Sequence, residues 1–305
     1  MCCIPRHCDV LYVRLVPRNL RALNLELFTL PSKSDFLLSR HILTKKHTMP
    51  LINYQQSHKI NSHGLSWPEL IHGTLVKRYN RFLADVKLVS GEVVTAHCPN
   101  SGTMKECSQP GRPVYLSFHD NPKRKLKYTW EMIKMPTSLV GVNTMVPNRL
   151  VKKSIEEGRV EQLKDFENIK SEIKVPGGSR LDLLLTKNEN EKCFVEIKNC
   201  TLVKDGIAYF PDAVTARGRK HLVELQNLVS KGNRCVMFFL VQRMDAKTFT
   251  TANHIDPAYG KEFRKAKNSG VEVMVYDVVM DLKEIILGKK IPFRHNDWGE
   301  FKCLH

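Results

Sequence analysis

The chain has 305 residues, of which 42% are hydrophobic and 26% are charged, the proportions of a folded protein with a substantial core. Its 48 Lys and Arg outnumber its 31 Asp and Glu, so the net charge is +17 and the sequence favours a polyanionic partner such as nucleic acid. The nine cysteines include no C-x2-C pair, which argues against a zinc site, and no apolar run reaches the roughly 20 residues of a membrane span.

Residues 1–66 form a basic leader that differs from the rest of the chain. They hold nine Lys or Arg and three Asp or Glu. One interpretation is an organelle transit peptide. The other, which the lack of Ser enrichment favours, is that translation starts at Met49. Without a secretory leader, the odd number of cysteines predicts reduced thiols and a cytoplasmic location.

Residues 67–140 read as short strands joined by turns rich in Gly, Pro and Asn. Strand patterns fill residues 71–97, with a turn at Ser90-Gly91, and a further strand is expected at 127–134. Several short strands with such turns over some seventy residues predict a small β-barrel or sandwich.

Residues 141–293 alternate between helix and strand patterns, ahead of a tail at 294–305. We expect helices at 148–163, 216–230 and 258–268, and strands at 179–186, 192–202, 234–242 and 271–280. A short C-terminal helix is expected within 281–292. This order predicts a mixed sheet with helices packed on its faces.

Two strands of this region carry a group of charged residues. Alternation places Glu196 and Lys198 on the same face of their strand, and Asp182 on the face of its strand opposite Leu181, Leu183 and Leu185. In a paired hairpin Asp182 can face Glu196. Two close carboxylates repel each other, and Mg²⁺ or Mn²⁺ is a natural partner.

Lys198 would then hold a water molecule or stabilise charge on a phosphate, and Glu172 could supply a third carboxylate. Periodicity alone gives equal weight to another interpretation, in which Asp182, Glu196 and Lys198 form a salt-bridge network that only fixes the strand register.

Four stretches of the chain resemble the sugar fermentation stimulation protein (SfsA) family over about residues 67–293. They are RYNRFLADVKL at 78–88, HCPNSGTM at 97–104, SRLDLLL at 179–185 with VEIKNCTL at 195–202, and FPDAVTARGRKHLVEL at 210–225. The resemblance implies an N-terminal OB-like β-barrel followed by a PD-(D/E)XK nuclease-like mixed-sheet α/β domain. It also implies binding of single- or double-stranded DNA with little sequence preference, and a link to the regulation of sugar (maltose) metabolism.

Three functions follow as hypotheses: a DNA-binding protein with a nuclease-like Mg²⁺ site, an active Mg²⁺-dependent DNA nuclease, and a binder of RNA or another polyanion. Asp212 and Thr215 are candidate N-caps of the helix at 216–230. The basic and aromatic side chains expected to contact DNA are Lys77, Arg78, Tyr79, Arg81, Phe82, Arg124, Lys125, Arg180, Arg217, Arg219, Lys220 and His221.

Overall fold

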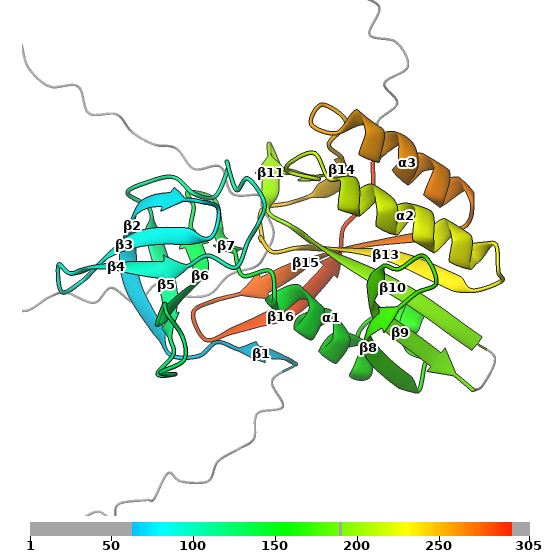
Figure 1. Ribbon diagram of the computed structural model, residues 1–305, viewed down its shortest axis with the longest axis horizontal. Coiled ribbons are helices and arrows are strands. Elements are labelled where there is room, and N and C mark those ends of the chain that lie inside the picture. The colour runs from blue at the N-terminus through cyan, green and yellow to red at the C-terminus, as the bar shows by residue number, and fades with distance from the viewer. Residues whose placement is uncertain (1–62, 189–190, 295–305) are drawn as a thin grey trace, which may run out of the picture. The chain divides into compact units, whose positions relative to one another are not determined.

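The computed structural model describes residues 63–188 and 191–294, and Figure 1 shows how their helices and strands are arranged. The expectations for residues 1–62, including a start at Met49, and for the tail at 295–305 lie outside the described residues. None of the helices in the described part of the chain has the length and apolar character needed to cross a membrane.

The first region is a closed five-stranded barrel, as the OB-like prediction requires. Its sheet runs β4-β3-β2-β5-β6, and a parallel pairing of β4 with β6 closes it. Alternate residues such as Leu75, Val86 and Leu116 point inward and are buried with Trp130. The strands are β2 (Leu70–Tyr79), β3 (Leu83–Leu88), β4 (Val93–His97), β5 (Pro113–Phe118) and β6 (Tyr128–Lys134), and β7 (Leu139–Gly141) extends the sheet beyond β6.

The second region is a seven-stranded mixed sheet with helices on both faces. Its order is β1-β16-β15-β13-β10-β9-β8, and β13 pairs in parallel with β10 and β15. These strands are β1 (Gly64–Ser66), β8 (Asn168–Lys174), β9 (Arg180–Lys187), β10 (Glu191–Cys200), β13 (Arg234–Val241), β15 (Glu272–Met280) and β16 (Glu284–Lys290). A separate small sheet contains β11 (Leu202–Lys204), β12 (Ile207–Phe210) and β14 (Thr248–Thr251).

Each face of the large sheet has its own core. One core holds α1 (Val146–Glu156) and the short η1 (Glu161–Leu163), and the other holds α2 (Ala216–Val229) and α3 (Pro257–Asn268). Figure 1 shows α2 and α3 side by side, away from α1. Strand β10 contributes side chains to both cores because they alternate between its faces, with Val195 toward α1 and Phe194 toward α2.

Three expectations for this region were wrong. Residues 284–290 form strand β16 instead of a C-terminal helix, because Ile285 and Leu287 alternate with more exposed residues and pack against the core beside α1. The helix expected at 148–163 ends at Glu156, before Gly158 with its positive φ of 69°. Leu181 packs in the core on the α2 side, while Leu183 and Leu185 pack on the α1 side.

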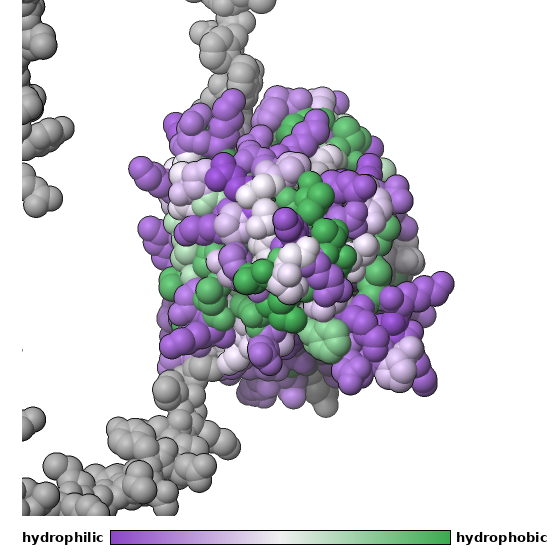
Figure 2. Space-filling model, turned by 90° about the vertical axis from the view of Figure 1, so that its left-hand side faces the viewer, coloured by the Kyte–Doolittle hydropathy of each residue, from purple (hydrophilic) through white to green (hydrophobic). Residues whose placement is uncertain are grey.

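The five cysteines of the described residues are free and buried. Burial raises the pKa of Cys193 and Cys235 to about 12, so both remain protonated thiols in the core. On the outside, Figure 2 shows apolar patches scattered among polar residues over the barrel side of the molecule. The exposed apolar side chains of the barrel include Val76, Val89 and Val93, an ordinary amount for a protein surface.

Candidate functional site

The predicted carboxylate pair lies on two neighbouring strands of the large sheet. Strands β9 and β10 pair antiparallel up to Leu183 opposite Val195, and Asp182 and Glu196 directly adjoin this last pair. Asp182 Oδ2 accepts a 2.7 Å hydrogen bond from the backbone N–H of Ile197, and its Oδ1 accepts a 2.8 Å bond from Asn148 Nδ2. The hairpin therefore brings the two carboxylates to one place.

Glu196 is at the centre of a buried cluster of charged groups. Its Oε1 contacts both Lys198 Nζ and His221 Nδ1, and these two nitrogens lie 3.4 Å apart. Only 2% of Glu196 is exposed, and its Oε2 is buried without a hydrogen-bond partner among the described residues. An unpaired buried carboxylate oxygen costs free energy, so this atom fits the role of a cation ligand.

The two carboxyl groups have opposite pKa shifts. Burial, and then the negative charge of Glu196, raise the pKa of Asp182 to about 6, although the Ile197 N–H, Lys198 and Asn148 oppose the rise. Burial also acts to raise the pKa of Glu196, but Lys198 and His221 outweigh it, so that pKa lies below its ordinary value. Near neutral pH, Glu196 is ionised and Asp182 is close to its titration point.

Glu172 lies near this pair without joining it. Its exposed carboxylate forms a 2.8 Å salt bridge with Arg180, and its positive φ of 56° interrupts the pairing of β8 with β9. Within the ranges that the structure describes, no group of three or more His, Cys, Asp or Glu side chains is arranged to hold a metal ion. A cation would thus depend on Asp182 and Glu196 here, and Glu172 would need to leave Arg180 to contribute.

Two cavities flank the carboxylates and share Arg217. One, of about 590 Å³, lies between the β8–β9 hairpin and α2, where Asp182, Arg180 and Lys220 line it. The other, of about 310 Å³, continues past Lys198 to Arg81 on the barrel. We call the two together the site groove. Basic side chains thus line both cavities, with Asp182 on the first and Lys198 on the second.

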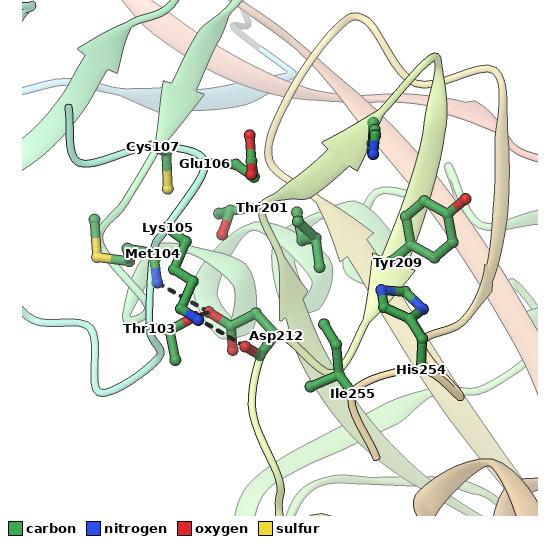
Figure 3. Close-up of a pocket in the computed structure, with 12 residues that line it drawn as sticks. Thr103, Met104, Lys105, Glu106, Cys107, Thr201, Tyr209, Asp212, His254 and Ile255 are labelled. Atoms are coloured by element: carbon green, nitrogen blue, oxygen red, sulfur yellow. Dashed lines mark hydrogen bonds between the residues drawn. The ribbon is translucent and has the colours of Figure 1, made fainter. Parts of the chain in front are cut away.

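Asp212 forms a contact between the barrel and the α/β region instead of capping α2. Thr215 is the N-cap, accepting a bond from the Gly218 N–H. Asp212 Oδ2 accepts a 3.1 Å bond from the Met104 N–H, while Thr103 Oγ1 donates to the Asp212 backbone oxygen at 2.8 Å. Figure 3 shows Asp212 turned toward this barrel loop, at the edge of another cavity.

The barrel residues expected to contact DNA fall into two groups. Arg78 donates to the backbone oxygens of Arg81, Asn100, Gly102 and Thr103 at 2.7–3.0 Å, so its guanidinium holds a loop and is not free for phosphate. Lys77 and Tyr79 both contact the carboxylate of Asp85. The exposed members of the set are Lys77, Arg81, Phe82 and Lys125, while Arg124 is half-buried and donates to Thr129.

The α2 residues are also divided. Arg217 and Lys220 are exposed and line the site groove, and Arg219 pairs with the buried carboxylate of Asp256 at 3.1 Å. His221 is only 4% exposed and contacts Glu196, yet it also lines the cavity of Arg217 and Lys220, so its contact with DNA stays a prediction. The sequence indicated that His221 is buried, because it precedes the buried Leu225 by four residues on one helix face. The sequence did not indicate that Asn148 donates a hydrogen bond to Asp182, since the two residues are distant in sequence.

Comparison with known proteins extends these observations. Residues 76–142 match the family model "SfsA N-terminal OB domain", and residues 145–284 match "Sugar fermentation stimulation protein RE domain". A sugar fermentation stimulation protein homolog from Geobacter sulfurreducens is 51% identical over 223 residues, covering 73% of this chain and 95% of that protein. A homolog from Marinomonas is 48% identical over 225 residues, covering 73% and 87%.

The solved structure of Pyrococcus furiosus SfsA in complex with Ca²⁺ is also similar. It aligns with a TM-score of 0.70 at 26% identity, over 76% of this chain and 98% of that one. The barrel is accordingly an OB domain, and the α/β region is an endonuclease-like domain. On this evidence, the chain belongs to the sugar fermentation stimulation protein (SfsA) family.

Proposed function

We propose that this protein binds DNA and that its endonuclease-like domain holds Mg²⁺ or Mn²⁺ between Asp182 and Glu196. The observation that carries the proposal is the buried, unpartnered Oε2 of Glu196 beside the carboxyl of Asp182, whose pKa burial and Glu196 raise to about 6. Carboxylate pairs of this kind are what Mg²⁺ takes from proteins, with water and phosphate oxygens completing its shell. The Ca²⁺ complex of Pyrococcus furiosus SfsA supports a divalent-cation site in the family.

The residues around the pair suit a phosphodiester. Arg217 and Lys220 line the site groove on the α2 side, and Lys220 has no hydrogen-bond or ion-pair partner among the described residues. Cations in such a groove would position the phosphate backbone without reading its sequence. The bound metal ion would supply charge neutralisation and a more acidic water.

A second candidate function is hydrolysis of DNA, and the position of Lys198 favours it. Its side chain is mostly buried, contacts Glu196 and lines the site groove. An ammonium held there would donate a hydrogen bond to a phosphate oxygen or to the attacking water. The salt-bridge interpretation of the three residues does not account for the unpaired Glu196 Oε2, because a network that only fixes register would satisfy both oxygens.

The test combines binding and cleavage by the full chain, using single-stranded, duplex and branched DNA with Mg²⁺ or Mn²⁺. Asp182→Ala and Lys198→Ala are the test variants, and Lys152→Ala is the control, because Lys152 pairs with Glu156 and lines neither cavity of the site groove. Metal-dependent cutting that both test variants lose would establish a nuclease. Binding without cutting would support a DNA-binding protein and contradict hydrolysis. The absence of DNA binding even at low salt would overturn both candidate functions.

RNA in the same titration tests the polyanion alternative, because equal affinity for RNA and DNA would point to a general polyanion binder. We further propose that the protein regulates sugar (maltose) metabolism genes and that it is cytoplasmic. The proposed domain ranges are 67–140 for the barrel and 141–293 for the endonuclease-like domain. Changed transcript levels of maltose genes in a deletion strain would support the regulatory part.

A further inference from the structure

A separate cavity of about 570 Å³ lies where the barrel meets α1 and β1. Its lining includes barrel residues (His97, His119, Arg124, Glu131) and, from the α/β side, Trp67 and Arg149. We call it the junction pocket. It shares no lining residue with the site groove, and its volume is in the range of small-molecule sites.

The rim of the junction pocket is positively charged. Arg149 is exposed and makes no hydrogen bond or ion pair with any described residue. Arg124 donates one hydrogen bond to Thr129. Burial and the nearby Arg124 lower the pKa of His97. Two guanidiniums with no carboxylate partner in residues 63–188 and 191–294 are suited to a phosphate group, which they can bind through paired hydrogen bonds.

The floor of the pocket is a buried polar chain centred on Glu131, which is 5% exposed. Glu131 Oε1 accepts a 2.6 Å bond from Ser117, and Oε2 accepts a 2.7 Å bond from Asn143. Ser117 Oγ in turn lies 3.0 Å from His119 Nε2. No cation pairs with Glu131 among the described residues, and each of its oxygens keeps a lone pair for another donor.

The remaining wall is largely apolar. Trp67 lies there with Leu65, Pro68, Val146 and Ile285, and a flat ring can pack on such a surface. The three parts have different chemistry: cations at the rim, a carboxylate on the floor and an apolar wall between them. A ligand that matches all three carries a phosphate, a planar ring and a hydrogen-bond donor on that ring.

We propose that the junction pocket binds a nucleotide, with its phosphate at Arg124 and Arg149 and an amino group of its base on Glu131. Carboxylates accept hydrogen bonds from base amino groups in this way. The nucleotide is either free or one unit of a DNA strand. The site is independent of Asp182 and Glu196, so the proposed function can fail without affecting it.

The test follows tryptophan fluorescence of the full chain during titration with dCMP, dTMP, deoxycytidine, inorganic phosphate and a short oligodeoxycytidylate. We expect dCMP to change the signal of Trp67, and Trp67→Phe to remove that change. Arg149→Ala should weaken binding of dCMP roughly tenfold or more, since a hydrogen bond between charged groups is lost. Lys152→Ala is the matched control, because Lys152 lies on the same helix, pairs with Glu156 and lines none of these cavities.

Glu131→Gln separates recognition of the base from recognition of the phosphate. Gln has a single acceptor oxygen, so the preference for dCMP over dTMP should disappear while binding of inorganic phosphate stays unchanged. Melting temperatures check that each variant is folded, and Arg149→Ala at an exposed position carries the test if Glu131→Gln does not fold.

Binding of dCMP together with the oligonucleotide would assign the pocket to a strand, and binding of dCMP alone would assign it to a free nucleotide. The proposal is overturned if no phosphate-bearing probe binds, if Arg149→Ala binds as the unaltered protein does, or if deoxycytidine binds as tightly as dCMP. Asp182→Ala should leave the binding of dCMP unchanged, because Asp182 lines the site groove and not the junction pocket.

Discussion

The OB barrel and the endonuclease-like domain hold their charged side chains in opposite ways. In the barrel, Arg78 donates to four backbone oxygens, and Asp85 is contacted by Lys77, Tyr79 and Thr95. In the endonuclease-like domain, Glu196 keeps a buried oxygen without a partner, and Asp182 sits where burial and Glu196 disfavour its charge. At these positions the barrel uses charge to hold the backbone and neighbouring strands, whereas Asp182 and Glu196 retain charge that weakens the metal-free fold. Retained charge of that kind is typical of a functional site.

The largest expected effect tests the barrel half of this comparison. Arg78→Ala should lower the free energy of unfolding by about 3 kcal/mol, because loop carbonyls in a partly buried site lose a charged donor. Lys77→Ala, at an exposed position with a 3.6 Å contact to Asp85, should change it by less than about 1 kcal/mol. Urea denaturation measures both, and equal effects would show that the Arg78 contacts contribute no more than a surface ion pair.

The next expected effect tests the endonuclease-like domain. Here the removal of a charge should raise the free energy of unfolding instead of lowering it. The pKa of Asp182 in the folded protein is about 6, above its ordinary 3.8, so the folded state favours the protonated carboxyl. This contribution to stability is fully present below pH 3.8 and is lost as the pH rises through 6. At pH 8 the ionised carboxylate costs up to about 3 kcal/mol.

Asp182→Asn should therefore stabilise the metal-free protein at pH 8 by an amount up to that limit, and the gain should vanish below pH 4. Unfolding in EDTA across this pH range measures it. Glu172→Gln, at the exposed partner of Arg180, is the control and should show no comparable gain. A destabilised Asp182→Asn protein at pH 8 would mean that the hydrogen bonds from Ile197 and Asn148 outweigh the cost of the charge.

A smaller effect is expected where the two domains meet. Asp212→Ala leaves the N–H of Met104 without its acceptor and removes one partner of Thr103. We expect a loss of about 1–2 kcal/mol and faster amide hydrogen exchange at Met104. Unchanged exchange there would show that other contacts hold the loop.

The smallest effect concerns cation binding and pH. A proton on Asp182 competes with a metal ion, so Mn²⁺ should bind several-fold more weakly at pH 5.5 than at pH 7.5. Calorimetric titration of the full chain measures this. An affinity independent of pH would indicate that Asp182 is not a ligand.

Much of the site could be predicted from the sequence because strand periodicity is simple. Alternation along residues 193–198 placed Glu196 and Lys198 on one face, and the antiparallel pairing of β9 with β10 brings Asp182 next to them. Contacts between distant segments could not be predicted in this way. Asn148 reaches Asp182 only once α1 packs on the sheet, and the bonds of Arg78 depend on where the 100–103 loop folds back.

The errors in the fold have a related cause. Strand β16 has only seven residues, and its apolar pattern is too short to separate a helical period from an alternating one. His221 was grouped with Arg217, Arg219 and Lys220 as an expected DNA contact, although the structure buries it against Glu196. The apolar stripe of α2 was the better guide, since a buried helix position is set by its phase and not by its neighbours in sequence.

Strand β1 has a consequence for how the protein can be divided. It precedes the barrel in the chain yet pairs with β16 at the edge of the endonuclease-like sheet. The barrel is therefore an insertion within the second domain, attached by two crossings of the chain. A single cut near Trp67 would not release an intact domain. It would remove β1 from β16 and leave the unpaired backbone groups of β16 open to aggregation. Separating the domains cleanly requires excising the barrel and rejoining Ser66 to the chain that follows it.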